Sequence, residues 1–208
     1  MKKELLSAEI YPSIHKVIVN ISGKAGLRNL NVYIYPSDLY TGEAKKDGVY
    51  LTTALVKDFY LHPHLLKFFF SHELIHFKNK EFLNLKKAFS VIIKLITSKI
   101  IPKPYLKLNA LRLLREMRAN IEGAALAGLN NNEILSAQEL AQKKNNSSIR
   151  PKSYEVGYPD REMIKDFCIR YKKLDESVAE EVLQDYCEKL NISNEKDFID
   201  KAIIAFFH

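Results

Sequence analysis

The chain has 208 residues, of which 47% are hydrophobic and 27% charged. This composition is typical of a globular protein with a hydrophobic core and excludes collagen-like, coiled-coil and intrinsically disordered chains. The 32 Lys and Arg residues exceed the 25 Asp and Glu residues by seven, an excess that permits an anionic partner without requiring one. Cys168 and Cys187 are too few for a disulfide framework, so we expect buried thiols and a cytoplasmic location.

The first third of the sequence alternates helical and extended patterns. Pro12 fits the first turn of a helix that ends before Gly26. Residues 31–35 and 49–53 have the β-branched and aromatic composition of strands, and the turn-rich stretch 41–48 separates them.

The remaining sequence has helical spacing of its apolar residues almost throughout. The expected helices cover residues 65–82, 85–101, 105–127, 133–143, 159–171, 176–190 and 193–207, with one long loop at 144–157. The apolar run ending at Ile101 contains Lys94 and Lys99 and falls short of the roughly 20 apolar residues that a membrane-spanning helix needs. Strands followed by helices predict an α+β fold, with one domain over 1–158 and a helical extension over 159–208 that packs on it.

The motif His72-Glu73-Leu74-Ile75-His76 lies within the expected helix 65–82. Histidines four residues apart share one face of a helix, so both imidazoles can bind a single ion. Glu73 can then take a proton from a metal-bound water, as in zinc metalloproteases. The alternative, a core helix with two incidental histidines, is disfavoured because the motif carries a complete mechanism.

A catalytic zinc site needs a third protein ligand. No histidine stands at Lys80 or Phe82, where other zinc-protease patterns place one, so a carboxylate is expected. The acids between the motif and the long loop are Glu81, Glu116, Glu122, Glu133 and Glu139. Glu81 is too close to His76 along the same helix, and Glu116 has apolar neighbours that favour an inward position. A solvated Glu116 paired with Arg112 or Arg115 is equally compatible with the sequence alone.

Residues 72–81 resemble the HExxHxxNxD segment of the gluzincin peptidases of the HtpX and CAAX-prenyl-protease type, and residues 116–120 resemble the ExxAD segment of that family. Weaker likeness extends to 48–55, which is similar to the family's substrate-binding strand, and to 158–161. The resemblance implies a zincin-like fold and hydrolysis of peptide bonds. BlaR-type sensor peptidases share a similar HExxH motif and a later Glu, so they are a neighbouring alternative.

The resemblance also implies a role for individual residues. The three protein ligands of one zinc ion would be His72, His76 and Glu116, and Glu73 would act first as general base and then as general acid. The predicted edge strand that pairs with an extended peptide or protein substrate comprises Val49, Tyr50, Leu51 and Thr52.

Three positions depart from the family pattern. Asn120 stands where the family has an Asp that orients a zinc-bound histidine, and its uncharged amide predicts weaker zinc binding. Glu81 replaces another Asp of the family, one that also lies next to the zinc ligands. Tyr158 replaces a later His; its hydroxyl could donate to the oxyanion of the tetrahedral intermediate, although a packed tyrosine is favoured.

Two alternatives to a soluble endopeptidase stay open. An inactive or regulatory binding module on the same scaffold is favoured by Asn120. Residues 85–107, which carry lysines beside apolar residues, could contact an anionic membrane surface, although packing of this amphipathic segment on the core is favoured. The lysines are scattered in pairs along the chain, so nucleic-acid binding is disfavoured. The sequence does not indicate an oligomeric state.

Overall fold

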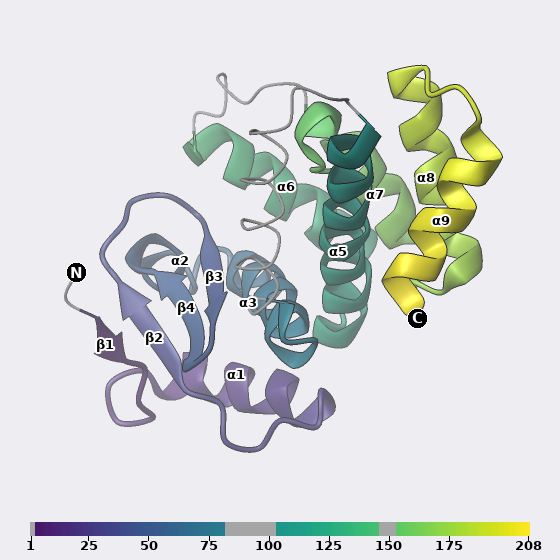
Figure 1. The fold of residues 1–208 in the computed structure, drawn as a ribbon. Coiled ribbons are helices and arrows are strands. Elements are labelled where there is room, and N and C mark those ends of the chain that lie inside the picture. The colour runs from purple at the N-terminus through teal and green to yellow at the C-terminus, as the bar shows by residue number, and fades with distance from the viewer. Residues whose placement is uncertain (1–2, 82–102, 146–152) are drawn as a thin grey trace.

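The computed structural model describes residues 3–81, 103–145 and 153–208, and the fold and the site are described for these ranges. A small sheet lies on one side of the molecule and a larger group of helices on the other (Figure 1). The expected α+β, mostly helical class is therefore confirmed for the described residues.

The sheet has four strands in the order β1 (Glu4–Leu5), β2 (Val32–Tyr35), β4 (Gly48–Thr52) and β3 (Gly42–Lys45). The neighbours β2 and β4 run parallel, with Ile34 opposite Leu51, and the other two pairs are antiparallel. The chain thus forms a tight hairpin from β3 into β4. Among the described residues, β3 has a hydrogen-bonded neighbour on one side only.

The predicted position of the edge strand is wrong. The segment Val49–Thr52 belongs to the inner strand β4, between β2 and β3, and its four side chains are at most 5% exposed. The sequence did not predict β3, because the glycine and lysines of 41–48 are weak strand formers. These residues adopt a strand here because they form hydrogen bonds with β4. An edge strand, which pairs with one neighbour, tolerates such residues.

Three helices accompany the sheet: α1 (Pro12–Lys24), α2 (Thr53–Lys57) and α3 (Pro63–Lys78). The prediction for α1 is confirmed, with Pro12 in the first turn. Helix α3 ends four residues earlier than predicted, because Lys80 has φ +54° and turns the chain back on itself.

The second half of the chain is helical, as predicted. It contains α5 (Lys103–Ala127), α6 (Asn131–Asn145), the 3₁₀ helix η2 (Ser153–Val156), α7 (Arg161–Arg170), α8 (Glu176–Leu190) and α9 (Glu195–Phe207). Helix α6 and η2 take up both ends of the expected long loop. The expected helix at 85–101 lies outside the described residues. Among the described helices, none combines the length and hydrophobicity that crossing a bilayer requires.

Helix α3 lies between the sheet and the helical layer and packs against both β3 and α5 (Figure 1). Fully buried apolar side chains fill the space around it, including Leu66, Phe70, Leu113, Met117 and Ile121. Helices α7, α8 and α9 pack on the other side of α5. The central pair of helices, α3 and α5, therefore connects the sheet with the C-terminal helices.

The two central helices approach closely at Gly123. A Cβ atom at this position would lie 3.0 Å from the backbone nitrogen of His72 and 3.0 Å from the carbonyl carbon of Ser71. These distances are shorter than normal van der Waals contact, so only a residue without a side chain fits without displacing α3.

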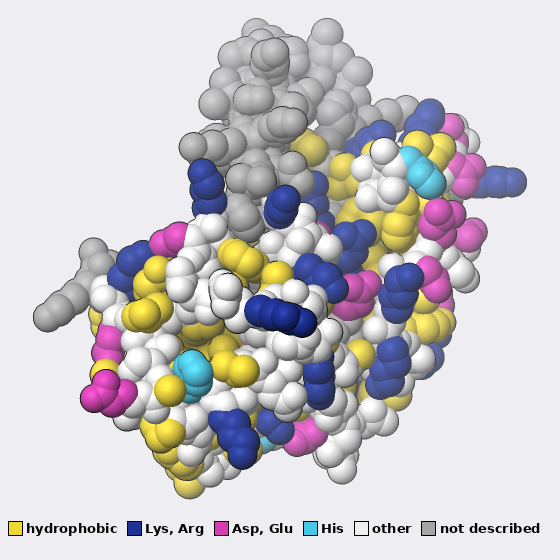
Figure 2. Space-filling view, turned by 90° about the horizontal axis from the view of Figure 1, so that it is seen from below, with side chains coloured by type: hydrophobic (Ala, Val, Ile, Leu, Met, Phe, Trp, Pro, Cys, Tyr) yellow, Lys and Arg dark blue, Asp and Glu magenta, His cyan; other side chains and the backbone are white. Residues whose placement is uncertain are grey.

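The view of Figure 2 shows one face of the molecule from below. Lysine and arginine side chains are spread over this face among neutral and hydrophobic ones, with no continuous basic band. This distribution agrees with the modest positive charge of the sequence.

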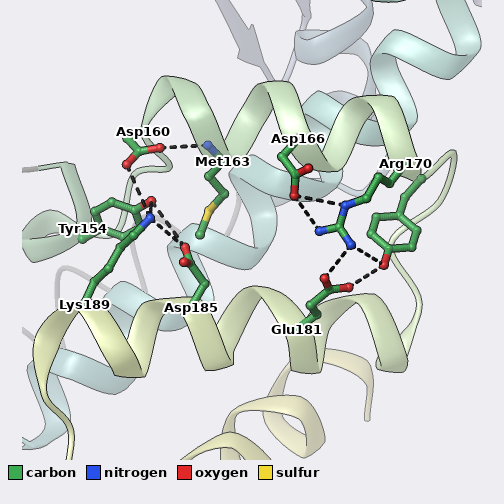
Figure 3. A network of polar contacts seen from close by, with 9 residues as sticks. Tyr154, Asp160, Met163, Asp166, Arg170, Glu181, Asp185 and Lys189 are labelled. Atoms are coloured by element: carbon green, nitrogen blue, oxygen red, sulfur yellow. Dashed lines mark hydrogen bonds and ion pairs between the residues drawn. The ribbon is translucent and has the colours of Figure 1, made fainter.

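Two polar clusters join α7 to α8 (Figure 3). In the first, Lys189 of α8 lies 2.9 Å from Asp185 and 3.6 Å from Asp160, and it also donates to the hydroxyl group of Tyr154 in η2. Asp160 is in addition the N-cap of α7, because its carboxylate accepts the backbone N–H of Met163 at 2.8 Å. The start of α7 is therefore held by both a cap and an ion pair.

The second cluster is centred on Arg170, near the end of α7. Its guanidinium lies 2.6 Å from Asp166 on the same helix and 2.6 Å from Glu181 on α8, and Tyr171 donates to Glu181 (Figure 3). Exposed ion pairs of this kind contribute little to stability individually. Together with the first cluster, they fix the register between the two helices.

We expect Gly123→Ala to be less stable than a matched variant, Gly23→Ala in α1. Both glycines lie in helices, where alanine is intrinsically favoured by up to about 1 kcal/mol, but a Cβ atom at Gly23 has no neighbour within 4 Å. The crowding at Gly123 costs about 1–3 kcal/mol. Chemical unfolding of both variants measures the difference; equal free energies of unfolding would contradict the close contact of α3 and α5.

Candidate metal centre

Three predicted ligand residues meet at the contact between α3 and α5. The Nε2 atoms of His72 and His76 lie 3.0 Å apart. The carboxylate of Glu116 places one oxygen 3.4 Å from Nε2 of His72 and the other 3.9 Å from Nε2 of His76. This group of side chains could bind one metal ion.

The position of Glu116 resolves an ambiguity of the sequence. Its ion pairs are with the two histidines, and its side chain is 20% exposed. Arg112 instead donates to the backbone carbonyl of Val156 at 3.1 Å. Glu122, a further carboxylate on α5, accepts the backbone N–H of Leu174 at 3.3 Å and so belongs to the contact with the C-terminal helices.

Asn120 orients the first histidine. Its Nδ2 donates to the backbone carbonyl of Glu116 at 2.8 Å, which leaves Oδ1 to accept the Nδ1–H of His72 at 3.1 Å. The proton on Nδ1 directs the Nε2 lone pair of His72 toward the centre. A carboxylate in place of this amide could not donate to the Glu116 carbonyl, so the amide suits both contacts.

Glu81 orients the second histidine. After the left-handed turn at Lys80, the carboxylate of Glu81 returns to accept the Nδ1–H of His76 at 2.5 Å. Arg118 lies 3.6 Å from the other oxygen of Glu81, and its guanidinium stands 4.0 Å from the ring centre of Phe206. The C-terminal helix α9 therefore contacts the ligand shell through Phe206, Arg118 and Glu81.

The electrostatics of the centre favour a cation between the imidazoles. Burial alone lowers the pKa of His76, but hydrogen bonds with Glu116 and Glu81 outweigh it and raise the pKa to about 10. Burial alone raises the pKa of Glu116, but hydrogen bonds with His72 and His76 hold it well below its usual range. Because both Nδ1 atoms donate outward, a proton or a metal ion must separate the two facing Nε2 lone pairs.

Glu73 lies beside the three ligands and beneath the edge strand β3. A Cβ atom on Gly42 would lie 2.7 Å from Cγ of Glu73, so the strand passes directly over the glutamate. The backbone N–H of Ala44 donates to the Glu73 carboxylate, and burial raises the pKa of this carboxyl group. Glu73 is therefore placed to hold a proton more readily than an exposed glutamate does.

A cleft of about 780 Å³ opens beside the centre. Its walls come from β3, α3, α5, α6 and the start of α7, and they include Gly42, Glu43, Ala44, His72, Glu73, His76, Glu81, Arg112, Arg115, Glu116, Asn120, Tyr158, Asp160 and Arg161. The predicted substrate-binding residues Val49–Thr52 do not line it. Tyr158 does, at 39% exposure, with the guanidinium of Arg112 5.5 Å from its ring centre; its role as an oxyanion donor stays a prediction.

Sequence reasoning missed several residues that shape this cleft or support the ligands. Asn145, at the end of α6, accepts the backbone N–H of Tyr40 at 2.8 Å and donates to its carbonyl at 2.9 Å. These bonds join α6 to the segment before β3 at the cleft wall. Arg118 and Phe206 were missed because they meet only through tertiary contacts. Arg112 shares a face of α5 with Glu116 and Asn120 at four-residue spacing, a pattern that the sequence did carry.

Neither models of protein families, nor the curated proteins, nor the solved structures contain a match to this chain. The resemblance to gluzincin peptidases therefore stays a prediction from the motifs of the sequence. The chemistry of the centre is accordingly inferred from the positions of its own side chains.

We expect Glu116→Ala to lose bound metal. Removing one of three ligands should reduce the metal that the protein retains after loading with zinc and dialysis against a weak chelator, from about one ion per chain to a small fraction. Elemental analysis by mass spectrometry measures it. Glu122→Gln is the matched control on the same helix, because a glutamine can still accept the Leu174 N–H; equal zinc content in the two variants would contradict the assignment of Glu116.

We expect Arg118→Gln to bind zinc about tenfold more weakly, since outer-shell partners of metal-bound histidines typically affect affinity by this amount. Without the guanidinium, Glu81 loses the ion pair that fixes the position of its carboxylate. The carboxylate then orients the imidazole of His76 less firmly. Competition with a chromophoric chelator measures the dissociation constant. Lys201→Gln, an exposed charge removal on α9, should leave it unchanged; an unaltered affinity in Arg118→Gln would exclude this route from α9 to the metal ligands.

Proposed function

We propose that this protein is a zinc-dependent endopeptidase with a zincin-like fold. The observation that carries the proposal is the convergence of His72, His76 and Glu116 on one point, with Glu73 beside them and an edge strand above. Two imidazoles and one carboxylate leave a fourth position open, which is the arrangement of catalytic rather than structural zinc sites.

The distances between the ligand atoms are compatible with a single zinc ion. Two ligands about 2.0–2.1 Å from a tetrahedral zinc ion lie about 3.3 Å from each other. The distances among the nitrogen and oxygen atoms of His72, His76 and Glu116 are 3.0, 3.4 and 3.9 Å, which bracket this value. The orienting contacts of Asn120 and Glu81 supply the outer shell that such histidines require.

Glu73 would act as the general base and then as the general acid. When bound, zinc would supply Lewis acidity that makes a water molecule more acidic and polarises the peptide carbonyl. The Glu73 carboxylate would take the proton of the attacking water and pass it to the leaving amine. Burial raises the pKa of Glu73 toward neutral pH. Such a pKa suits a group that must both accept and return a proton.

The edge strand β3 would position the substrate. Within residues 3–81, 103–145 and 153–208, its only strand neighbour is β4, and Gly42, Glu43 and Ala44 line the cleft. An extended peptide could therefore add to the sheet along β3. This proposal replaces β4 with β3 as the strand that binds the substrate backbone.

A binding module without catalysis is the second candidate, and Asn120 is the residue that favours it. The amide supports the geometry of His72 but adds no negative charge to the shell, so such a module would bind zinc and leave peptides intact. The cytoplasmic location stays a prediction. Contact of 85–107 with a membrane surface also stays a prediction, since most of that segment lies outside the described residues.

We expect Glu73→Gln to keep zinc and lose peptidase activity. The glutamine is nearly isosteric but cannot take a proton, so cleavage of unstructured casein should fall at least about 100-fold, the usual contribution of a general base. Electrophoresis of casein digests and elemental analysis of the same protein measure both quantities.

The control for this variant is Glu180→Gln, which removes an exposed carboxylate on α8 and should keep wild-type cleavage. Casein cleavage retained by Glu73→Gln would refute the role of Glu73. Zinc bound at one ion per chain by a wild-type protein that leaves casein intact would favour the binding module.

A further inference from the structure

One stretch of the cleft wall is not used by the metal centre. Arg112 and Arg115 lie on α5 immediately before Glu116, and both line the cleft. Four residues of helix correspond to about 6 Å along its axis, so Arg112 stands one turn from the ligand carboxylate. An extended peptide bound at the centre would reach this distance within about two residues.

Four other charged side chains of the cleft wall are already paired. Among the described residues of the cleft wall, Glu43 pairs with Lys45 at 2.9 Å, Arg161 with Glu139 at 2.8 Å, Glu81 with Arg118 and Asp160 with Lys189. Within the same described part of the chain, no carboxylate forms an ion pair with Arg112 or Arg115.

Arg112 is also held in a defined place. Its NH1 donates to the carbonyl of Val156, and its guanidinium lies against the ring of Tyr158. These contacts leave other N–H groups of the guanidinium without a partner in the described structure. A fixed guanidinium with unused donors is suited to a planar carboxylate, because it loses little conformational freedom on binding.

We infer that Arg112 and Arg115 form a carboxylate-binding subsite, so that the preferred substrates are peptides with an acidic group within a few residues of the scissile bond. This inference rests on the proposed peptidase function. The carboxylate could belong to an Asp or Glu side chain or to the free C-terminus of the peptide, since the guanidinium groups recognise the same chemistry in both.

The test measures binding to the Glu73→Gln protein loaded with zinc, in which peptides are not consumed. Three dye-labelled octapeptides are compared by fluorescence anisotropy at 0.1 M salt: alternating Ala and Glu with an amidated C-terminus, alternating Ala and Gln with an amidated C-terminus, and the Ala and Gln peptide with a free C-terminus. At least one carboxylate-bearing peptide should bind about tenfold more tightly than the neutral peptide.

The same preference should fall to less than about threefold in Arg115→Gln, made in the same background. Arg115 has no hydrogen bond or ion pair in the described structure, so its loss should leave the fold intact, which the zinc content and circular dichroism check. Arg112→Gln should have a similar effect. Lys16→Gln, which removes an exposed charge on α1, is the control for net charge and should keep the full preference.

The outcomes separate the two possible sources of the carboxylate. Tighter binding of the Glu peptide alone assigns the subsite to acidic side chains, and tighter binding of the free-acid peptide alone assigns it to the C-terminus. Equal binding of all three peptides, or a preference that Arg115→Gln and Arg112→Gln both retain, would overturn the subsite. If the wild-type protein neither binds zinc nor cleaves casein, the proposed function fails, and the titration without zinc still decides whether the arginines select carboxylates.

Discussion

The close packing of α3 against α5 is the constraint on which the metal centre depends. The two histidines come from one helix and the carboxylate from another, forty or more residues later. Gly123 lets the backbones approach beside His72, and the buried side chains of Met117 and Ile121 hold the helices there. Because the hydrophobic core orders the ligands, their conformational entropy is lost on folding rather than on binding metal.

Polar contacts around the ligands convert this packing into a defined geometry. Asn120 and Glu81 accept the Nδ1–H groups of the two histidines, so both Nε2 atoms face inward. Two facing lone pairs beside a carboxylate form a site that requires a positive charge. The raised pKa of His76 and the lowered pKa of Glu116 express the same requirement.

The C-terminal helices contribute to the site as well as to the fold. Helix α9 reaches the outer shell where Phe206 lies against Arg118, and the ion pair of Asp160 with Lys189 holds the start of α7 at the cleft wall (Figure 3). On the opposite side, β3 covers Glu73 at Gly42. The cleft thus has an edge strand on one side and an arginine-bearing helix on the other, the two surfaces that the proposed function assigns to different parts of a peptide.

The sequence by itself determined the α+β class, most helix positions, and the pair His72 and His76, because helical spacing and four-residue neighbours are local properties. The sequence limited the candidates for the third ligand to a few acidic residues. It could not single out Glu116, since the identity of that ligand depends on which face of α5 packs against α3. It also misassigned the edge strand, because strand order is set by pairing between distant segments and β3 gains its conformation from β4. Only the tertiary structure revealed that Arg118 pairs with Glu81 and lies against Phe206. These contacts join residues far apart in the sequence, so no local sequence pattern could predict them.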